Sequence, residues 1–267
     1  MSAGAPGDPV RRRRPRWVAA AAAAALLGGG LLLLWPHAQH FSQGLPPDQF
    51  HRALDPELAA RYPEVLGVAH NAANRLDTLA VALEHGADVV EADVISVRGE
   101  LVAGRDQPLG WLSNHLFRGP TLAEVWDAAA AADVLKLDLK RDDEAFLDDL
   151  VAFLAPRQGD REVMVSSRDR AALLRLHRDL PDVTLLFSIG FPEGVRQVRA
   201  DAELQRAIAG VSVFQGLVDS RLVGWADDRD LLVLAWPVND AATLATTVRR
   251  GADGITTANL AVLEALA

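Results

Sequence analysis

Two short segments of the sequence place charged side chains in rows between apolar ones. Residues 136–140 read Lys-Leu-Asp-Leu-Lys and contain the only two lysines of the chain. Because alternate side chains of a β-strand share a face, Lys136, Asp138 and Lys140 would lie together. Segment 89–94, Val-Val-Glu-Ala-Asp-Val, pairs Glu91 with Asp93 in the same way. Ionised groups are costly to bury without partners, so the two rows predict a site for a metal ion and an anion.

The residue types indicate which chemistry this site could perform. Glu91, Asp93 and Asp138 offer the oxygen ligands that a hard divalent cation, Ca²⁺ or Mg²⁺, prefers. A phosphodiester is an anion that repels nucleophiles, so its hydrolysis needs positive charge on the non-bridging oxygens and a base for the attacking hydroxyl. Lys140 would supply fixed charge. His70 is the candidate base, since an unperturbed imidazole has a pKa of about 6.5.

The surrounding chain alternates between short apolar runs and helical stretches. The runs span residues 65–70, 89–95, 100–104, 134–140, 162–166, 183–189, 210–214, 231–238 and 254–257, and the helical stretches span 76–85, 121–132, 143–154, 169–180, 221–228 and 241–250. This alternation predicts an α/β fold, a (β/α)₈ TIM barrel. The sequence offers nine apolar runs for the eight strands of such a barrel, so we expect segment 100–104 to be an extra or tightly connected strand. A doubly wound sheet would alternate similarly, but no glycine-rich phosphate loop follows the first run.

Chemistry in such barrels occurs at the carboxyl ends of the strands. The polar residues expected there are His70, Glu91, Asp93, Arg105, Asp106, Asp138, Lys140, Ser166, Ser167 and Asn239. Ser166 and Ser167 are also candidates to cap the following helix, and Asp253 in Gly-Ala-Asp-Gly is expected to fix a turn.

The amino terminus indicates attachment to a membrane. Arginines at 11–14 and 16 precede an uncharged run, 17–35, whose length suits a bilayer crossing. We therefore expect a basic cytoplasmic N-terminus (1–16), a single N-terminal transmembrane helix acting as signal anchor (17–35), a linker with a leading helix (36–63) and an extracytoplasmic barrel (64–267). The alternative, a cleaved signal peptide, lacks a clear small-x-small pair after the run.

Composition excludes several classes of function. The chain has no cysteine, which rules out disulfides, thiolate catalysis and cysteine-bound metals. Without residues 1–40 it carries 22 basic and 35 acidic residues, a net charge of −13. Such a surface repels nucleic acid, so no nucleic-acid partner is expected.

Six motifs in order resemble the glycerophosphodiester phosphodiesterase family, of the phosphatidylinositol phospholipase C-like superfamily. They are His70-Asn71, Glu91-x-Asp93, Leu-Asp138-Leu-Lys140, Val165-Ser-Ser167, Trp236-Pro-Val-Asn239 and Gly251-Ala-Asp-Gly-Ile-Thr256, and they span roughly residues 64–260. The resemblance implies a metal-dependent attack on a phosphodiester small molecule or lipid head group. We then expect a catalytic role for His70, Lys140 and Arg105, and metal binding by Glu91, Asp93 and Asp138. Asn71, Asn74, Arg105, Trp236 and Asn239 are then the expected substrate contacts.

Two departures from the family pattern accompany this resemblance. The family's Glu-Asn-Thr, whose glutamate is expected to bind the metal, falls on Leu76-Asp77-Thr78, and its second catalytic histidine falls on Arg105. Arginine cannot donate a proton near neutral pH, but its fork can clamp a phosphate. His115 is the histidine placed to replace the missing acid.

Three other interpretations remain open at the level of sequence. The acids could pair with Lys136 and Lys140 in a purely structural salt-bridge network. Lys140 could form a Schiff base in an aldolase-like barrel. The barrel could also be degenerate and bind a phosphorylated ligand or protein partner without turnover. Asparagine near the first histidine also occurs in the menorin-like and sphingomyelinase D-like branches of the superfamily, which widens the substrate class.

Overall fold

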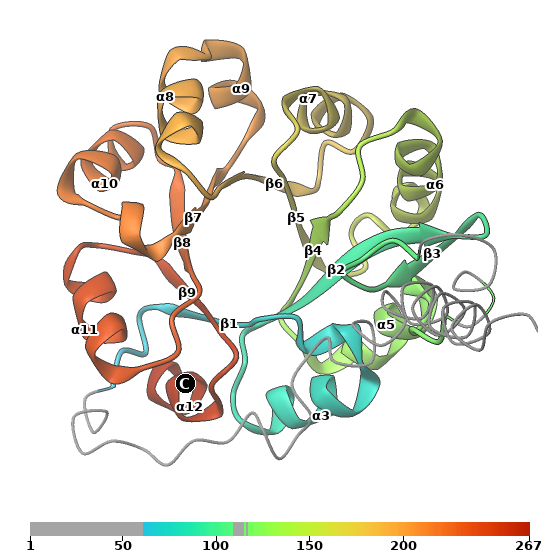
Figure 1. The fold of residues 1–267 in the computed structure, drawn as a ribbon, viewed down its shortest axis with the longest axis horizontal. Coiled ribbons are helices and arrows are strands. Elements are labelled where there is room, and N and C mark those ends of the chain that lie inside the picture. Colours follow the sequence, from blue (N-terminus) through green and yellow to red (C-terminus); the bar gives the residue numbers. More distant parts are fainter. Residues whose placement is uncertain (1–60, 109–114, 116) are drawn as a thin grey trace, which may run out of the picture.

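The protein folds around a closed barrel of parallel strands, seen end-on in Figure 1. The structure is a computed structural model that describes residues 61–108, 115 and 117–267. The barrel strands are β1 Leu66–Ala69, β2 Val89–Val97, β4 Val134–Leu139, β5 Glu162–Ser167, β6 Thr184–Ile189, β7 Gly210–Phe214, β8 Leu232–Trp236 and β9 Gly254–Thr257. Each strand pairs in parallel with the next, and β1 pairs with both β9 and β2, which closes the ring. The predicted TIM barrel is confirmed.

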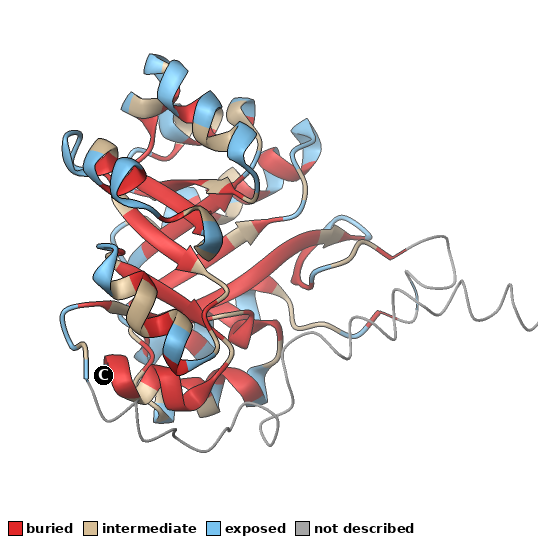
Figure 2. Cartoon of the chain, turned by 60° about the vertical axis from the view of Figure 1, so that its left-hand side comes forward, coloured by how far each residue is buried: buried red, intermediate tan, exposed pale blue. Residues whose placement is uncertain are grey.

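The ninth apolar run is the additional strand β3, Glu100–Ala103, which stands outside the ring. It pairs antiparallel with the second half of β2, with Val94 opposite Ala103 and Val97 opposite Glu100. Arg98 and Gly99 connect the two strands, and both have a positive φ, of 58° and 77°. A tight hairpin of this kind suits two residues in the left-handed region. The β2–β3 hairpin therefore extends beyond the barrel mouth (Figure 2).

Helices follow the strands and cover the outside of the ring. The α-helices are α3 Leu76–Glu84, α5 Leu122–Ala128, α6 Glu144–Leu154, α7 Arg170–Asp179, α8 Pro192–Ala200, α9 Ala202–Ala207, α10 Ser220–Asp227, α11 Ala241–Arg249 and α12 Leu260–Leu266, and short 3₁₀ turns are η2 Ala72–Asn74, η3 Ala129–Ala131, η4 Ala155–Arg157 and η5 Gln215–Leu217. Most helices begin at a capping side chain that accepts a backbone N–H. Thr121 and Glu124 form a reciprocal capping box at α5.

The expected cap of α7 was partly wrong. Asp169 caps this helix by accepting a hydrogen bond from the Ala172 N–H, and the Ser167 hydroxyl accepts from the Asp169 N–H. Ser166 instead donates to Asp138 inside the barrel. The aspartate succeeds because its carboxylate stands directly before the first helical residue, where it also complements the helix dipole.

Of the three apolar clusters among the described residues, two lie against the strands of the ring. The larger lies between the strands and the helices and gathers alternate strand residues such as Val90, Leu135 and Val211. The smaller fills the lower interior of the ring and consists of Val68, Val89, Val134, Met164, Leu186 and Leu234. Two residues further along the same strands, on the same face, come His70, Glu91, Lys136, Ser166, Ser188 and Trp236. The interior thus changes from apolar to polar in one step toward the carboxyl ends of the strands.

The predicted membrane segment, 17–35, lies outside the described residues, as do the basic N-terminus and most of the linker. Within the part of the chain that the structure describes, no helix combines the length and the apolar character that a membrane crossing needs.

Candidate active site

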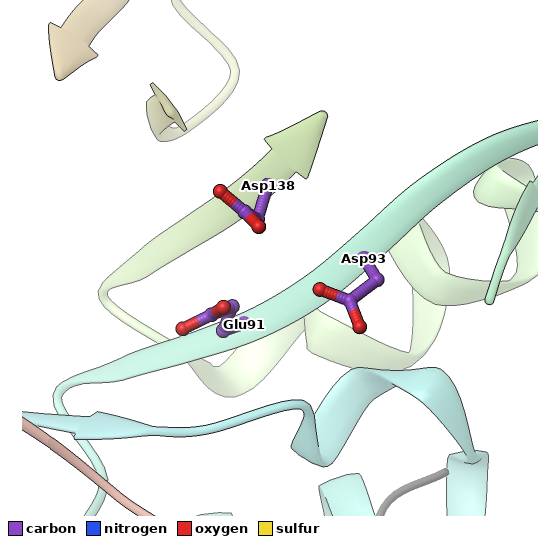
Figure 3. Close-up of side chains that lie close together, drawn as sticks. All are labelled: Glu91, Asp93 and Asp138. Carbon is purple, nitrogen blue, oxygen red and sulfur yellow. The ribbon is translucent and has the colours of Figure 1, made fainter. Parts of the chain in front are cut away.

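Strands β2 and β4 place the two predicted charged rows side by side. Their register sets Glu91 opposite Lys136 and Asp93 opposite Asp138. Because the strands are parallel, both rows run toward the same end of the barrel. One ligand oxygen from each of Glu91, Asp93 and Asp138 lies within 4.8 Å of the others, and Figure 3 shows the three carboxylates facing a common space. The predicted convergence of the three acids is present, with two of them on β2 and one on β4.

The two lysines pair with these same acids. The ammonium Nζ of Lys136 lies 3.2 Å from Glu91 Oε2, and that of Lys140 lies 2.8 Å from Asp93 Oδ1 and also contacts Asp138. The ion-pair network considered from the sequence therefore exists in the same place as the carboxylate cluster. Three acids against two lysines leave one excess negative charge in a buried setting, so the network does not neutralise itself.

Neutral side chains hold the acids in position. The Asn74 amide donates to Asp93 Oδ2 at 3.2 Å, and its oxygen accepts the Asp93 backbone N–H at 2.8 Å. The Asn71 amide lies 3.1 Å from both Asp93 oxygens, so its nitrogen must face them. Ser166 of β5 donates a hydrogen bond to Asp138 of β4. Both asparagines, expected to contact substrate, thus act on Asp93.

The electrostatic environments of the two aspartates differ. Burial raises the pKa of Asp93, and the charges of Asp138 and Glu91 raise it further against the opposing effect of Lys140. Burial also disfavours ionised Asp138, but Lys140 and Lys136 outweigh it and hold the pKa of Asp138 below its usual range. Burial would lower the pKa of Lys140, yet Asp138 and Asp93 raise it well above its ordinary value. Lys140 is therefore a firmly charged ammonium.

An inner cavity of about 260 Å³ opens beside the acids at the carboxyl ends of the strands. Its lining residues are His70, Asn71, Glu91, Arg105, Lys136, Asp138, Lys140, Arg168, Ser188, Ser212, Trp236, Pro237 and Thr256. The sequence thus placed His70, Arg105 and Trp236 correctly at the barrel mouth. The edge of the Phe214 ring meets the Trp236 ring at 5.9 Å between centroids, which fixes one wall.

Three buried polar atoms of this cavity have no hydrogen-bond partner among the described residues: Glu91 Oε2, Trp236 Nε1 and Thr256 Oγ1. Glu91 Oε2 has only its ion pair with Lys136, whose geometry is not that of a hydrogen bond. Buried donors and acceptors are normally satisfied, and unsatisfied ones are costly. Their gathering in one polar cavity indicates a space made for a ligand.

An outer cavity of about 390 Å³ adjoins the inner one. It is lined by Arg105, Asp106, Asp138, Leu139, Lys140, Arg141, Asp142, Ser167, Arg168, Asp169 and Ser188. Five of these residues also line the inner cavity: Arg105, Asp138, Lys140, Arg168 and Ser188. The two cavities therefore meet over Asp138 and Lys140.

The donor set fits a hard divalent cation. Three carboxylate oxygens within 4.8 Å of one another are the ligand type that Ca²⁺ and Mg²⁺ take, and Glu91 Oε2 has no hydrogen-bond donor. The excess negative charge, felt most strongly at Asp93, would be relieved by a cation. Glu91, Asp93 and Asp138 are thus the residues that could hold a metal.

Two residues depart from the family pattern, Leu76 and Arg105, and only Arg105 borders the cavities beside the carboxylate cluster. Leu76 begins α3 with 41% of its surface exposed and lines a separate groove with Arg118 and Glu124, so the carboxylate cluster forms without a contribution from position 76. Arg105 lines both cavities at the place expected for a phosphate clamp. His115 is exposed and lines neither cavity.

Asn239 lies beside the cavity and is engaged locally. Its side-chain oxygen accepts from the Thr257 hydroxyl at 3.0 Å and from the Ala258 N–H at 2.8 Å, while Asn259 donates to its backbone carbonyl. These bonds join the loops after β8 and β9. Asn239 therefore shapes the rim in this structure, and its expected contact with substrate stays a prediction.

Sequence reasoning assigned no site role to four polar lining residues of the inner cavity: Arg168, Ser188, Ser212 and Thr256. The last three could have been found, because each stands two positions after an inward-facing residue on its strand. Arg168 gave no such signal, since it follows the end of β5 in a sequence rich in arginine.

Solved structures resemble the chain across the barrel. An Oleispira antarctica phosphodiesterase in complex with its product sn-glycerol-3-phosphate is 20% identical, with a TM-score of 0.63 over 75% of this chain and 96% of that one. A glycerophosphodiester phosphodiesterase from Thermotoga maritima is 18% identical, with a TM-score of 0.59 over 76% and 98%. A calcium-dependent phosphoinositol-specific phospholipase C from Pseudomonas sp. is 11% identical, with a TM-score of 0.54 over 78% and 94%. No family model and no curated protein matches the sequence.

The chain thus shares its barrel fold with several solved phosphodiesterases. The Thermotoga maritima neighbour, which is named a glycerophosphodiester phosphodiesterase, shares the barrel with this chain at low identity. The resemblance seen in the sequence motifs is confirmed at the level of fold.

Proposed function

We propose that this protein hydrolyses a phosphodiester with the help of a divalent cation, Ca²⁺ or Mg²⁺, held by Glu91, Asp93 and Asp138. The observation that carries the proposal is the convergence of these three acids within 4.8 Å at a cavity that His70 also lines. The shared fold with phosphodiesterases, one of them a calcium-dependent enzyme, supports it.

Each residue of the site has a separate task in this reaction. His70 accepts the proton of the attacking hydroxyl and can return it to the departing oxygen. The guanidinium of Arg105 offsets charge on the non-bridging oxygens. Lys140 stays protonated and fixes Asp93 and Asp138, and Trp236 forms a wall for the organic part of the substrate. The bound cation would supply Lewis-acid polarisation of the phosphoryl oxygens.

The substrate we propose is a lipid or a lipid-derived diester of the glycerophosphodiester type. The Oleispira antarctica neighbour holds sn-glycerol-3-phosphate, and the inner cavity of this chain offers hydroxyl partners for a polyol at Ser188, Ser212 and Thr256. We further propose that segment 17–35 anchors the barrel to a membrane, with the N-terminus cytoplasmic and the barrel on the other side.

The test is hydrolysis of a panel of glycerophosphodiesters by the full chain, with and without chelator. We expect turnover that chelator abolishes and that added Ca²⁺ or Mg²⁺ restores. His70→Ala should lower kcat by about 10² to 10⁴-fold, the usual contribution of a general base. His177→Ala, an exposed histidine of α7, is the matched control and should retain full activity. Undiminished turnover in His70→Ala would remove the assigned base.

A second candidate is a barrel that binds a phosphorylated ligand without turnover. The pairing of Lys136 and Lys140 with the three acids favours it, because such a network can be structural. Arg105 in place of a proton donor favours it as well. Thermal stabilisation by sn-glycerol-3-phosphate with no product from any diester would select this candidate.

The aldolase interpretation of Lys140 is disfavoured by the surroundings of its ammonium. A Schiff-base lysine needs a lowered pKa so that the neutral amine is available. The carboxylates of Asp138 and Asp93 raise the pKa of Lys140 instead.

A further inference from the structure

Arg168 occupies the junction of the two cavities. It follows the last residue of β5, Ser167, and precedes the cap of α7, Asp169. It lines both the inner and the outer cavity, together with Arg105, Asp138, Lys140 and Ser188. A group placed at this junction would therefore touch Arg168 whichever cavity the rest of the ligand entered.

The side chain of Arg168 has no hydrogen bond and no ion pair within the described part of the chain, which sets it apart from other arginines nearby. Arg170 binds Asp201 and Glu203, and Arg175 binds acids on two helices. In a chain where acidic residues outnumber basic ones, an arginine at a cavity mouth readily finds a partner. Arg168 offers its five donors to the cavity instead.

The surroundings of Arg168 fix where its guanidinium lies. A Cβ atom built on Gly190 would be 3.7 Å from the Arg168 Nη2 and 3.8 Å from the Trp236 ring. The guanidinium therefore lies over Gly190 beside the indole, where any side chain at position 190 longer than alanine would compete for its space. In the lining of the same inner cavity, Trp236 Nε1 and Thr256 Oγ1 have no hydrogen-bond partner in the described residues. Unused donors of three side chains thus meet around one space.

The two ammonium groups of the site, unlike the guanidinium of Arg168, already form ion pairs with carboxylates. Lys136 is 2% exposed and pairs with Glu91, and Lys140 pairs with Asp93 and Asp138. Asn71, which follows His70, is neutral. Besides a bound cation, side-chain positive charge for an incoming anion must therefore come largely from the two arginines at the rim of the site, Arg105 and Arg168.

Resting on the proposed function, we infer that Arg168 holds the phosphate of the substrate at the junction of the two cavities. A phosphodiester has one phosphorus and two organic arms, so a phosphate at the junction lets one arm enter each cavity. The planar guanidinium suits this task, because it can donate two parallel hydrogen bonds to non-bridging oxygens. Arg168 then binds substrate and phosphate product alike and makes no contact specific to either arm.

The test compares Arg168→Gln and Arg168→Lys with the wild-type full chain. Arg196→Gln is the control for removal of one positive charge, since Arg196 pairs with Glu193 on the exposed face of α8. Two readouts are needed: KM and kcat for several glycerophosphodiesters with different head groups, and the Kd of sn-glycerol-3-phosphate measured by calorimetry. Loss of one charge-assisted hydrogen bond or a pair of them corresponds to about 10- to 100-fold in affinity.

We expect Arg168→Gln to raise KM and the Kd of sn-glycerol-3-phosphate by similar factors for every head group. Arg168→Lys should recover part of the loss, because an ammonium keeps the charge but not the fork. Arg196→Gln should match the wild type. A KM that changes for one head group alone would show an arm contact and overturn the inference, and so would an unchanged KM and Kd.

The same measurements separate this inference from the proposed function. A wild-type protein that turns over no diester, yet binds sn-glycerol-3-phosphate through Arg168, would retain the inference and refute hydrolysis. Hydrolysis by Arg168→Gln with unchanged KM and Kd would support the proposed function and refute the inference. Absence of both turnover and binding in the wild type would refute both.

Discussion

Two layers inside the same barrel differ by a shift of two residues along each strand. The lower layer, Val68, Val89, Val134, Met164, Leu186 and Leu234, is a closely packed apolar cluster. The upper layer, His70, Glu91, Lys136, Ser166, Ser188 and Trp236, is polar and borders the cavities or, at Ser166, binds Asp138. Since residues i and i+2 of a strand share a face, the same backbone positions both layers.

The comparison of the two layers shows how the barrel tolerates the free-energy cost of burying charged side chains. Each large apolar side chain of the lower layer contributes roughly 1.5–3 kcal/mol by burial. Each charge of the upper layer loses hydration that its ion pairs return only in part. The lower layer therefore stabilises the ring, and the upper layer uses the rigidity of that ring to keep ionised groups close together.

The largest effect is expected where the upper layer loses one half of a buried pair. Glu91→Gln leaves the ammonium of Lys136 buried without its carboxylate. Breaking a buried ion pair in this way costs about 3–5 kcal/mol, so the free energy of unfolding should fall by that amount in urea denaturation. The site should lose a metal ligand at the same time.

The double variant Glu91→Leu with Lys136→Met is the matched control for charge. It removes both charges and keeps apolar volume, so its stability should be close to that of the wild type or above it, while activity stays lost. A single variant as stable as the wild type would mean that Glu91 and Lys136 do not depend on each other.

A smaller effect, confined to stability, is expected in the lower layer. Leu234→Ala removes a fully buried side chain that fills the space left open by Gly254. Large-to-small substitutions of this kind cost about 2–5 kcal/mol. Denaturation should report the loss, whereas KM of the folded fraction at low temperature should stay unchanged. A shifted KM would show that the two layers are not mechanically separate.

The sequence was informative where pattern and chemistry agree. The alternation of runs and the charged rows at Glu91–Asp93 and Lys136–Lys140 predicted the barrel and the meeting of three acids. Three helices were missed, α8, α9 and α12. Helix α12 is buried nearly all round, so it has no amphipathic period to recognise, and α8 is mostly polar with a proline at its first position.

Roles that depend on tertiary partners could not be predicted from residue type. The hydrogen bonds of Asn74 with Asp93, and of Asn239 with the loop after β9, could not be read from the sequence, and the substrate contacts expected of both residues stay predictions. Arg168 could not be distinguished from other arginines until the structure showed that it has no acidic partner among the described residues. The sequence shows which polar side chains are present. The folded structure is needed to see which of them have no partner in the protein and can bind a ligand.

Calorimetric titration of Ca²⁺ and Mg²⁺ into the metal-free full chain tests the central claim most directly. Glu91, Asp93 and Asp138 should bind one cation, and Asp138→Asn, which keeps the size of the side chain, should weaken that binding strongly. Asp142→Asn, an acid of the outer cavity that belongs to no such cluster in the described residues, should bind as the wild type does. Absence of binding to the wild type, or equal binding by Asp138→Asn, would contradict the metal site and leave the acids and lysines as a structural network.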